Sequence, residues 1–202
     1  MPRLTRTKRS PAVLRPAGRR AFLGVLLTFI VASGDWARCW AQSDLQAAEY
    51  KVKAAFLYKF AGYVEWPSQV FERPESAFVI GVIGADALGD QLAQIVAGRS
   101  IGGRPVAVRT LRRGEPVSGL HILFIGRASG GRPLDVMASA KGRPVLTVTE
   151  SEDAFALGSM INFVIVEDKV RFDVAPREAE LANLKVSARL LSVARKVLAG
   201  PS

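Results

Sequence analysis

The sequence predicts one α/β domain of three-layer type, in which a mainly parallel sheet carries helices on both faces and ends in a C-terminal antiparallel hairpin. Continuous apolar runs of strand length, residues 77–84 and 120–126, are typical of strands covered on both sides. These runs alternate with segments of helical period, which indicates βαβ units with right-handed crossovers. The segments 160–166 and 170–174 flank three polar residues, as expected for an antiparallel hairpin.

The domain is expected to open with a long helix over residues 43–64. Ser43 or Asp44 can cap its start, since short polar side chains accept from the first free backbone N–H groups. The helix is expected to end at Trp66-Pro67, because proline disfavours helical geometry in the residue before it. Its expected apolar face consists of four residues at helical spacing: Val52, Phe56, Phe60 and Tyr63.

The remaining elements follow from the same periodicities. In chain order they are a strand at 77–84, a helix at 88–97, strands at 105–111 and 120–126, a helix at 134–140, a strand at 144–148 and the hairpin strands 160–166 and 170–174. A helical stretch is expected from Pro176, and a last helix over residues 185–198. The expected buried stripe of that last helix is Val186, Leu190, Val193 and Val197.

Residues 1–41 have the pattern of a secretory signal peptide. Seven basic and no acidic side chains fill the first twenty residues, and an uncharged apolar run of about a dozen residues follows. Small residues, Cys39 and Ala41, stand at −3 and −1 of a cleavage site after Ala41. The apolar run is shorter than the roughly 20 residues of a membrane-spanning helix, although an uncleaved anchor stays open. We therefore expect residues 42–202 to form a mature periplasmic protein.

The export route stays open. Arg19-Arg20, followed by one residue and two apolar ones, resembles the twin-arginine motif, and Arg38 before the cleavage site fits that route. Cys39 is not expected to accept a lipid, because Arg38 occupies the position where a small residue is needed.

Charge and cysteine content change once the leader is set aside. The whole chain carries 28 basic and 18 acidic residues, of which residues 1–41 hold eight basic and one acidic. The remainder has 20 basic and 17 acidic residues, a net charge of +3, so the high overall charge does not indicate a nucleic-acid partner. Cys39 is the only cysteine, which excludes disulfides and thiol chemistry from the mature chain.

Catalytic, cofactor and metal motifs are absent from the sequence pattern. His121, the only histidine, lies within an apolar run and is interpreted as a packing residue rather than a catalytic one. Glu150, Glu152 and Asp153 follow a strand end, where α/β proteins bind ligands, but are interpreted as a solvated acidic loop. No set of residues has the spacing of a metal site, a nucleophile elbow or a dinucleotide fingerprint. We therefore expect no enzyme activity, no cofactor and no metal.

Three groups of residues resemble the motifs of the YfiR-like family. The first is YKVKAAFLYKF at 50–60 with VEWP at 64–67, and the second is GSMINF at 158–163 with VRFD at 170–173. The third is LKVSARLL at 184–191, which resembles the family's C-terminal helix. The motifs occur in the family's order and span nearly all of the mature chain.

The resemblance implies a small periplasmic α/β protein without known catalysis. In the best-understood member, such a protein represses a membrane diguanylate cyclase by binding its periplasmic domain, and an outer-membrane lipoprotein relieves the repression. The partner implied here is the periplasmic domain of an inner-membrane diguanylate cyclase or sensor kinase, and a homodimer stays open. That repressor carries cysteines in its mature domain, so redox control does not transfer to this chain.

Four residues are candidate partner contacts. Tyr50, Tyr58 and Trp66 belong to a segment with more aromatic residues than one helix face can bury, and Arg171 alternates with apolar residues in a strand. Aromatic and arginine side chains dominate interface energies. Internal packing of the aromatic residues, or a buried ion pair for Arg171, is the alternative. The functional alternative is a periplasmic carrier or sensor of a small ligand that binds at the strand ends.

Overall fold

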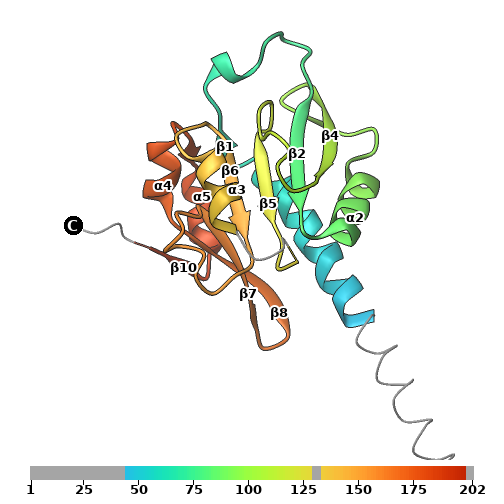
Figure 1. Ribbon diagram of the computed structural model, residues 1–202, viewed down its shortest axis with the longest axis vertical. Helices are drawn as coiled ribbons and strands as arrows, with labels where there is room; N and C mark the ends of the chain where they lie inside the picture. Colours follow the sequence, from blue (N-terminus) through green and yellow to red (C-terminus); the bar gives the residue numbers. More distant parts are fainter. Residues whose placement is uncertain (1–43, 129–132, 199–202) are drawn as a thin grey trace, which may run out of the picture. The chain divides into compact units, whose positions relative to one another are not determined.

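The computed structural model describes residues 44–128 and 133–198, which form a mixed α/β domain (Figure 1). The expected signal peptide at 1–41, with its cleavage site and Cys39, lies outside the described residues. Of the helices that are described, none is both long enough and apolar enough to span a bilayer.

A mixed sheet forms the centre of the domain, with the strand order β10-β8-β7-β6-β5-β2-β4-β3. Its strands are β2 (Phe78–Ile83), β3 (Ser100–Ile101), β4 (Arg104–Leu111), β5 (Ile122–Ile125), β6 (Leu146–Thr149), β7 (Ile161–Val166), β8 (Lys169–Val174) and β10 (Lys196–Val197). Neighbours from β4 through β2, β5 and β6 to β7 are parallel. β8 pairs with β7 antiparallel, β3 pairs with β4 antiparallel, and β10 pairs with β8 parallel.

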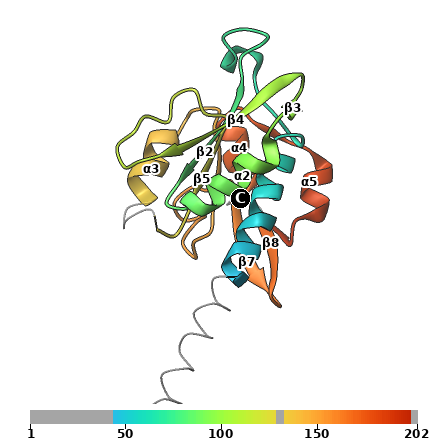
Figure 2. The same ribbon diagram turned by 90° about the vertical axis from the view of Figure 1, so that its right-hand side faces the viewer.

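Helices cover the two faces of this sheet unequally. Along β2, the side chains of Phe78, Ile80 and Val82 point to what we call the first face, and Ile83 points to the second face. The helix over residues 44–60 covers the first face together with α2 (Asp86–Val96), α4 (Pro176–Leu181) and α5 (Ala188–Val193). The second face is covered by α3 (Pro133–Ala140) and by the loop before β5. Figure 2 shows α3 on one side of the sheet and the N-terminal helix and α5 on the other.

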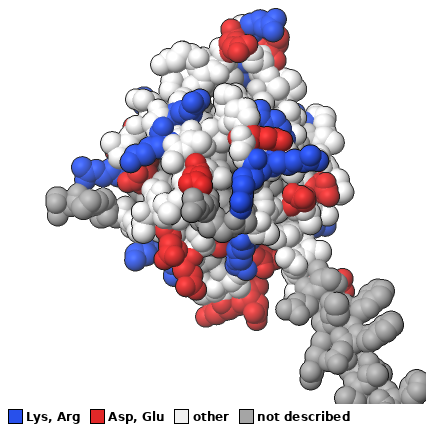
Figure 3. Space-filling model, in the orientation of Figure 1, with Lys and Arg blue, Asp and Glu red and all other residues white. Residues whose placement is uncertain are grey.

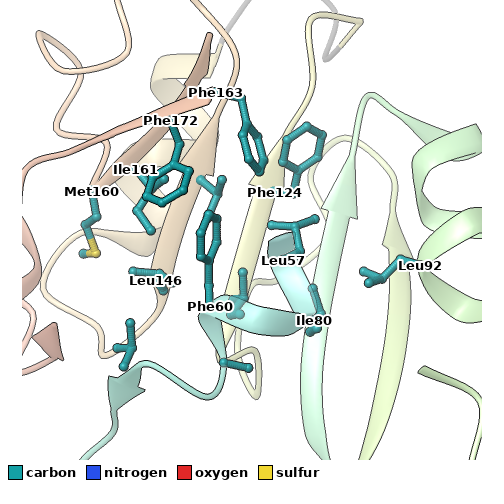
Figure 4. Close-up of a cluster of buried hydrophobic side chains, with 14 of the residues drawn as sticks. Leu57, Phe60, Ile80, Leu92, Phe124, Leu146, Met160, Ile161, Phe163 and Phe172 are labelled. Carbon is teal, nitrogen blue, oxygen red and sulfur yellow. The ribbon is translucent and has the colours of Figure 1, made fainter. Parts of the chain in front are cut away.

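A cluster of phenylalanine rings lies among the aliphatic side chains of the core on the first face (Figure 4). The ring of Phe60 lies 5.8 Å from that of Phe163 and 5.0 Å from that of Phe172, between centroids. Phe56 contacts the same two rings at 6.1 and 5.4 Å. Such ring pairs add about 0.5–1.5 kcal/mol each to the burial of their area, so they fix the N-terminal helix on β7 and β8.

The core on the second face is smaller and mostly aliphatic. Leu123 and Ile125 of β5 pack there with Met137 of α3, and the cluster also includes Leu111 at the end of β4 and Val117 in the loop that follows it. This face therefore receives less cover than the first.

A second, two-stranded sheet joins the beginning of the domain to its end. β1 (Val64–Glu65) pairs antiparallel with β9 (Lys185–Val186), with Val64 opposite Val186. The N–H of Ser187 donates to the carbonyl of Tyr63 at 2.9 Å, which extends the pairing by one residue. A short 3₁₀ turn, η1 (Ser68–Val70), follows β1.

The pairing of β1 with β9 explains why the first helix is shorter than predicted. The sequence favours a helix up to residue 64, whereas the structure ends it at residue 60 because Val64 takes part in the small sheet. The predicted apolar face is also rotated: Val52 is 44% exposed, while Ala54 and Leu57 are fully buried. Ser43 lies outside the described residues.

The predicted helix over residues 185–198 is wrong. The structure divides that segment into β9, α5 and β10. Val186 pairs in the small sheet and Leu190 is buried, but Val193 and Val197 are 63% and 43% exposed. The helix stops because Ala194 turns extended and the segment after it pairs with β8.

Candidate functional site

The four candidate contact residues lie in different surroundings. The hydroxyl of Tyr58 contacts the carbonyl of Ser100 at 3.5 Å, and the guanidinium of Arg99 lies 5.3 Å from the tyrosine ring centre. The hydroxyl of Tyr50 accepts from Gln46 at 3.2 Å. Both tyrosines are half-buried, so each offers part of its ring to solvent.

Trp66 belongs to an aromatic cluster at the amino ends of β2 and β5. Its indole N–H donates to the carbonyl of His121 at 3.1 Å, and its ring meets Phe78 edge-on at 4.9 Å. The His121 ring stacks against both Phe71 and Phe78, with centroids 4.6 and 4.7 Å away, and these two phenylalanine rings lie 6.5 Å from each other. Arg104 lies over the outer face of Phe71, at 3.8 Å from the ring centre. Trp66 is half-buried, but its polar atom has a structural partner within the domain.

His121 is a packing residue in which only one of the two ring nitrogens has a hydrogen-bond partner among the described residues. Its Nδ1 accepts from the N–H of Val79 at 3.0 Å, so the proton of the neutral ring is assigned to Nε2. Nε2 is buried and has no hydrogen-bond partner among the described residues. Burial, with a smaller contribution from the nearby charge of Arg104, lowers the pKa of His121 to about 4. A neutral ring at neutral pH suits stacking against two phenylalanines.

A buried ion pair joins the N-terminal helix to the carboxyl end of β6. Lys53 is fully buried and its ammonium group donates to the carboxylates of Glu49 and Glu150. Glu150 also accepts from the N–H of Arg127 at 3.0 Å. Because Glu150 is only 5% exposed, its interpretation as part of a solvated loop is wrong, whereas Glu152 and Asp153 are exposed. Burying these charges costs free energy of desolvation unless each keeps its partner. The helix is therefore held in the position where Lys53 reaches Glu150.

The second motif forms a buried polar network on the second face. The side-chain oxygen of Asn162 accepts from the hydroxyl of Thr149 at 2.8 Å and from the N–H of Ser151 at 3.1 Å. The Ser159 hydroxyl lies 2.9 Å from that of Thr149 and bonds the carbonyl of Ile161 at 2.8 Å. These bonds hold the loop between β6 and β7 against the sheet, which gives the motif a structural role.

Asp173 in the same motif also has a structural partner. Its carboxylate is 4% exposed and binds the guanidinium of Arg195 with two hydrogen bonds, one of them 2.8 Å long. Two-point contacts of this kind fix geometry as well as charge. The pair fastens the chain before β10 to β8.

The tip of the β7–β8 pair exposes apolar and charged side chains together. Glu167 and Asp168 connect the strands with positive φ angles of 49° and 56°, the geometry of a tight two-residue turn. Ile165 and Val166 are 42% and 36% exposed, and Arg171 is exposed opposite Val164. Figure 1 shows this tip projecting from the body of the domain. Arg171 therefore faces outward and is not part of an ion pair among the described salt bridges.

A cavity of about 300 Å³ lies at the carboxyl ends of β2 and β4. Ile83, Leu111 and Val117 provide an apolar floor, and Val136 of α3 provides a wall. Charged and polar residues form the rim: Arg112, Arg113, Glu115, Asp135 and Ser139. No group of three metal-ligating side chains comes together within residues 44–128 and 133–198.

Sequence reasoning missed the ion pair and the cavity. Lys53 was one of several lysines on an amphipathic helix, and its only local signal is Glu49 one turn earlier. The cavity lies where α3 packs against the loop after β4, and no local sequence pattern predicts that tertiary contact.

Comparison with known proteins identifies a family. A family model described as YfiR/HmsC-like matches residues 50–195. A comparison with curated proteins finds no match. The matched range contains all three motifs and the Lys53–Glu150 and Asp173–Arg195 pairs, whereas Glu49 lies one residue before it.

Proposed function

Because the chain belongs to the YfiR/HmsC-like family, we propose that it is a periplasmic regulator that binds the periplasmic domain of an inner-membrane diguanylate cyclase and holds that enzyme inactive. The observation that carries this proposal is the extent of the family match, which runs from the N-terminal helix to the segment after α5. The family is regulatory rather than enzymatic. A sensor kinase is the second class of partner, and an outer-membrane lipoprotein would relieve the repression.

The proposal requires export. Residues 1–41 would direct the chain across the inner membrane and be removed after Ala41, leaving Gln42 as the first residue. Mass spectrometry of protein from the periplasmic fraction tests this step. Intact Met1 on cytoplasmic protein would contradict it, and Arg19→Lys with Arg20→Lys separates the two export routes.

The four candidate contacts are not equally suited to a partner. Arg171 is exposed at a projecting tip, opposite Val164 and on the same face of the hairpin as the exposed Val166, and such a mixture of apolar and arginine side chains is typical of interface centres. Tyr50 and Tyr58 are half-buried and offer ring edges. A role of Trp66 in partner binding is the hardest to test by mutation, because its N–H bond to the carbonyl of His121 also supports the fold. Trp66→Phe, which keeps an aromatic ring and loses that bond, is therefore a better probe than Trp66→Ala.

Deletion of the gene should raise cyclic di-GMP and surface attachment. Arg171→Glu should reproduce the deletion while the protein still folds, because an interface anchor contributes at least about 2 kcal/mol, roughly thirtyfold in affinity. Arg189→Glu, the same change of charge at an exposed position on α5, is the matched control and should leave repression intact.

Affinity capture of the tagged protein from solubilised membranes identifies the partner. Recovery of a cyclase supports the proposal. Recovery of a sensor kinase instead supports a regulatory role with that second class of partner. If deletion leaves cyclic di-GMP unchanged and capture yields neither enzyme, the regulatory role fails and carriage of a small ligand becomes the better account.

A further inference from the structure

The cavity beside α3 occupies the place where α/β proteins bind ligands. After β2 the chain passes through α2 to β4 on one side of β2, and it then returns to β5 on the other side. Ligands bind beyond the carboxyl ends of the strands near such a reversal. The cavity lies there, over Ile83 at the end of β2 and Leu111 at the end of β4.

The crevice between β2 and β5 is itself closed. A Cβ atom at Gly126 would lie 2.4 Å from the carbonyl oxygen of Gly84, so the two turns after these strands touch. Since even a single added methyl group would clash there, no phosphate or ring fits between these two turns. The free space is displaced toward β4 and α3, where the cavity lies.

The cavity is held open by the loop that forms its outer wall. Arg109 on β4 donates to the carbonyls of Pro116 and Ser118, the latter at 3.4 Å, and so fastens the loop after β4. Gly114 turns this loop with φ +83°, and no atom lies within 4 Å of the position of its missing Cβ. A braced loop over an apolar floor is a preformed site, which reduces the entropy lost on binding.

The lining selects one class of ligand. The floor of Ile83, Leu111 and Val117 favours an apolar group, and its volume is at the lower end of the range for small-molecule sites. Arg112 at the rim is exposed and matches a carboxylate in geometry. Glu115 and Asp135 stand on the same rim and would repel a second negative charge.

We propose that this cavity binds a small amphipathic monocarboxylate, with its apolar part on the Ile83–Leu111–Val117 floor and its carboxylate paired with Arg112. The site would make the protein responsive to a small molecule. This inference does not rest on the regulatory role proposed above, since binding is measured without any partner.

Phenylacetate and phenylacetamide are suitable probes, because they share a shape and differ in charge. Titration of the purified protein, followed by NMR chemical shifts or calorimetry, should show phenylacetate bound at least tenfold more tightly than the amide. Arg112→Gln should remove this difference by weakening phenylacetate about tenfold, the loss of one charge-assisted contact. Arg189→Gln is the matched control and should change neither affinity.

Filling the cavity tests the location of binding. Val117→Trp should abolish binding of both probes, and Val136→Trp, placed on the half-buried wall, provides a second variant if the first fails to fold. Equal affinity for the two probes, an unchanged affinity in Arg112→Gln, or binding that survives a folded tryptophan variant would each overturn the proposal. Absence of binding at about 10 mM phenylacetate, a free energy weaker than about 3 kcal/mol, would also overturn it.

Discussion

The two faces of the sheet differ in how they are covered and in what they can do. Four helices and a cluster of phenylalanine rings cover the first face, whereas α3, a loop and a polar network cover the second. Figure 3 views the second face, where basic and acidic side chains are interspersed around the α3 region. Stability is therefore expected to come mainly from the first face, and ligand binding from the thinner cover of the second.

The largest effect is expected at the ion pair that fixes the first-face helix. Lys53→Ala removes the only cation bonded to Glu150 among the described salt bridges and leaves that carboxylate 2% exposed beside Glu49. Breaking one side of a buried pair costs about 3–5 kcal/mol. Urea denaturation measures the loss, and Lys51→Ala on the exposed side of the same helix should stay within about 0.5 kcal/mol of wild type. A loss below about 1 kcal/mol would show that the pair is not essential to the fold.

A matched pair of truncations compares the two cores directly. Phe163→Ala removes a ring that contacts Phe56, Phe60 and Phe124, and should cost about 3–5 kcal/mol. Met137→Ala in α3 should cost about 2 kcal/mol, the low end for such a change, because the thin cover can collapse onto the gap. Thermal melts rank the two variants, and the reverse order would contradict the assignment of stability to the first face.

Acid should destabilise the domain through His121, at the amino ends of β2 and β5. The pKa of His121 is about 4 in the folded state and about 6.5 when unfolded, so the unfolded chain binds the extra proton between these values. This contribution to stability is complete above about pH 6.5 and is lost as the pH falls toward 4, by about 3 kcal/mol. Urea midpoints at a series of pH values measure it. His121→Asn, which can still accept from Val79, should show a shallower loss than wild type; equal slopes would refute the role of His121.

The smallest loss of stability is expected from adding a methyl group at Gly81, which is closely packed on the second face. A Cβ atom at Gly81 would lie 2.5 Å from Leu120 and 2.9 Å from Leu111, both at the ends of side chains. Gly81→Ala should therefore cost about 1 kcal/mol, the low end for overpacking, if these leucines can shift. Gly62→Ala meets only one backbone oxygen at 3.5 Å and serves as the control. A cost above about 3 kcal/mol for Gly81→Ala would show that the second face is as rigid as the first.

Strands buried on both faces were the part of the fold most easily predicted. The runs at 77–84 and 120–126 contain β2 and β5, because central strands must be apolar on both sides. The C-terminal segment could not be predicted in this way. Its apolar residues have helical spacing, but Val186 pairs with β1 and Lys196 pairs with β8. This tertiary pairing overrides the local preference for a helix.

The candidate contact residues stay predictions, but the structure adds what their surroundings are. Residue type selected Tyr50, Tyr58, Trp66 and Arg171 as candidates, but only the structure shows that Trp66 bonds His121 and that Arg171 projects from a tip. Charge has the same ambiguity in sequence. Lys53 and Lys51 are two residues apart, and only their positions around the helix decide that one is buried and the other exposed.

The pairing of β1 with β9 also governs the order in which the chain can fold. Val64 can pair only after Val186 has been synthesised. Lys53 can bond Glu150, which is 97 residues later in the chain, only after that residue has been synthesised. Closing such long loops costs entropy before any contact is gained, and proteins rich in distant contacts fold slowly. The N-terminal helix therefore cannot acquire its native contacts until nearly the whole domain has been synthesised. During that interval its aromatic side chains are exposed, which makes the incomplete chain a substrate for chaperones and proteases.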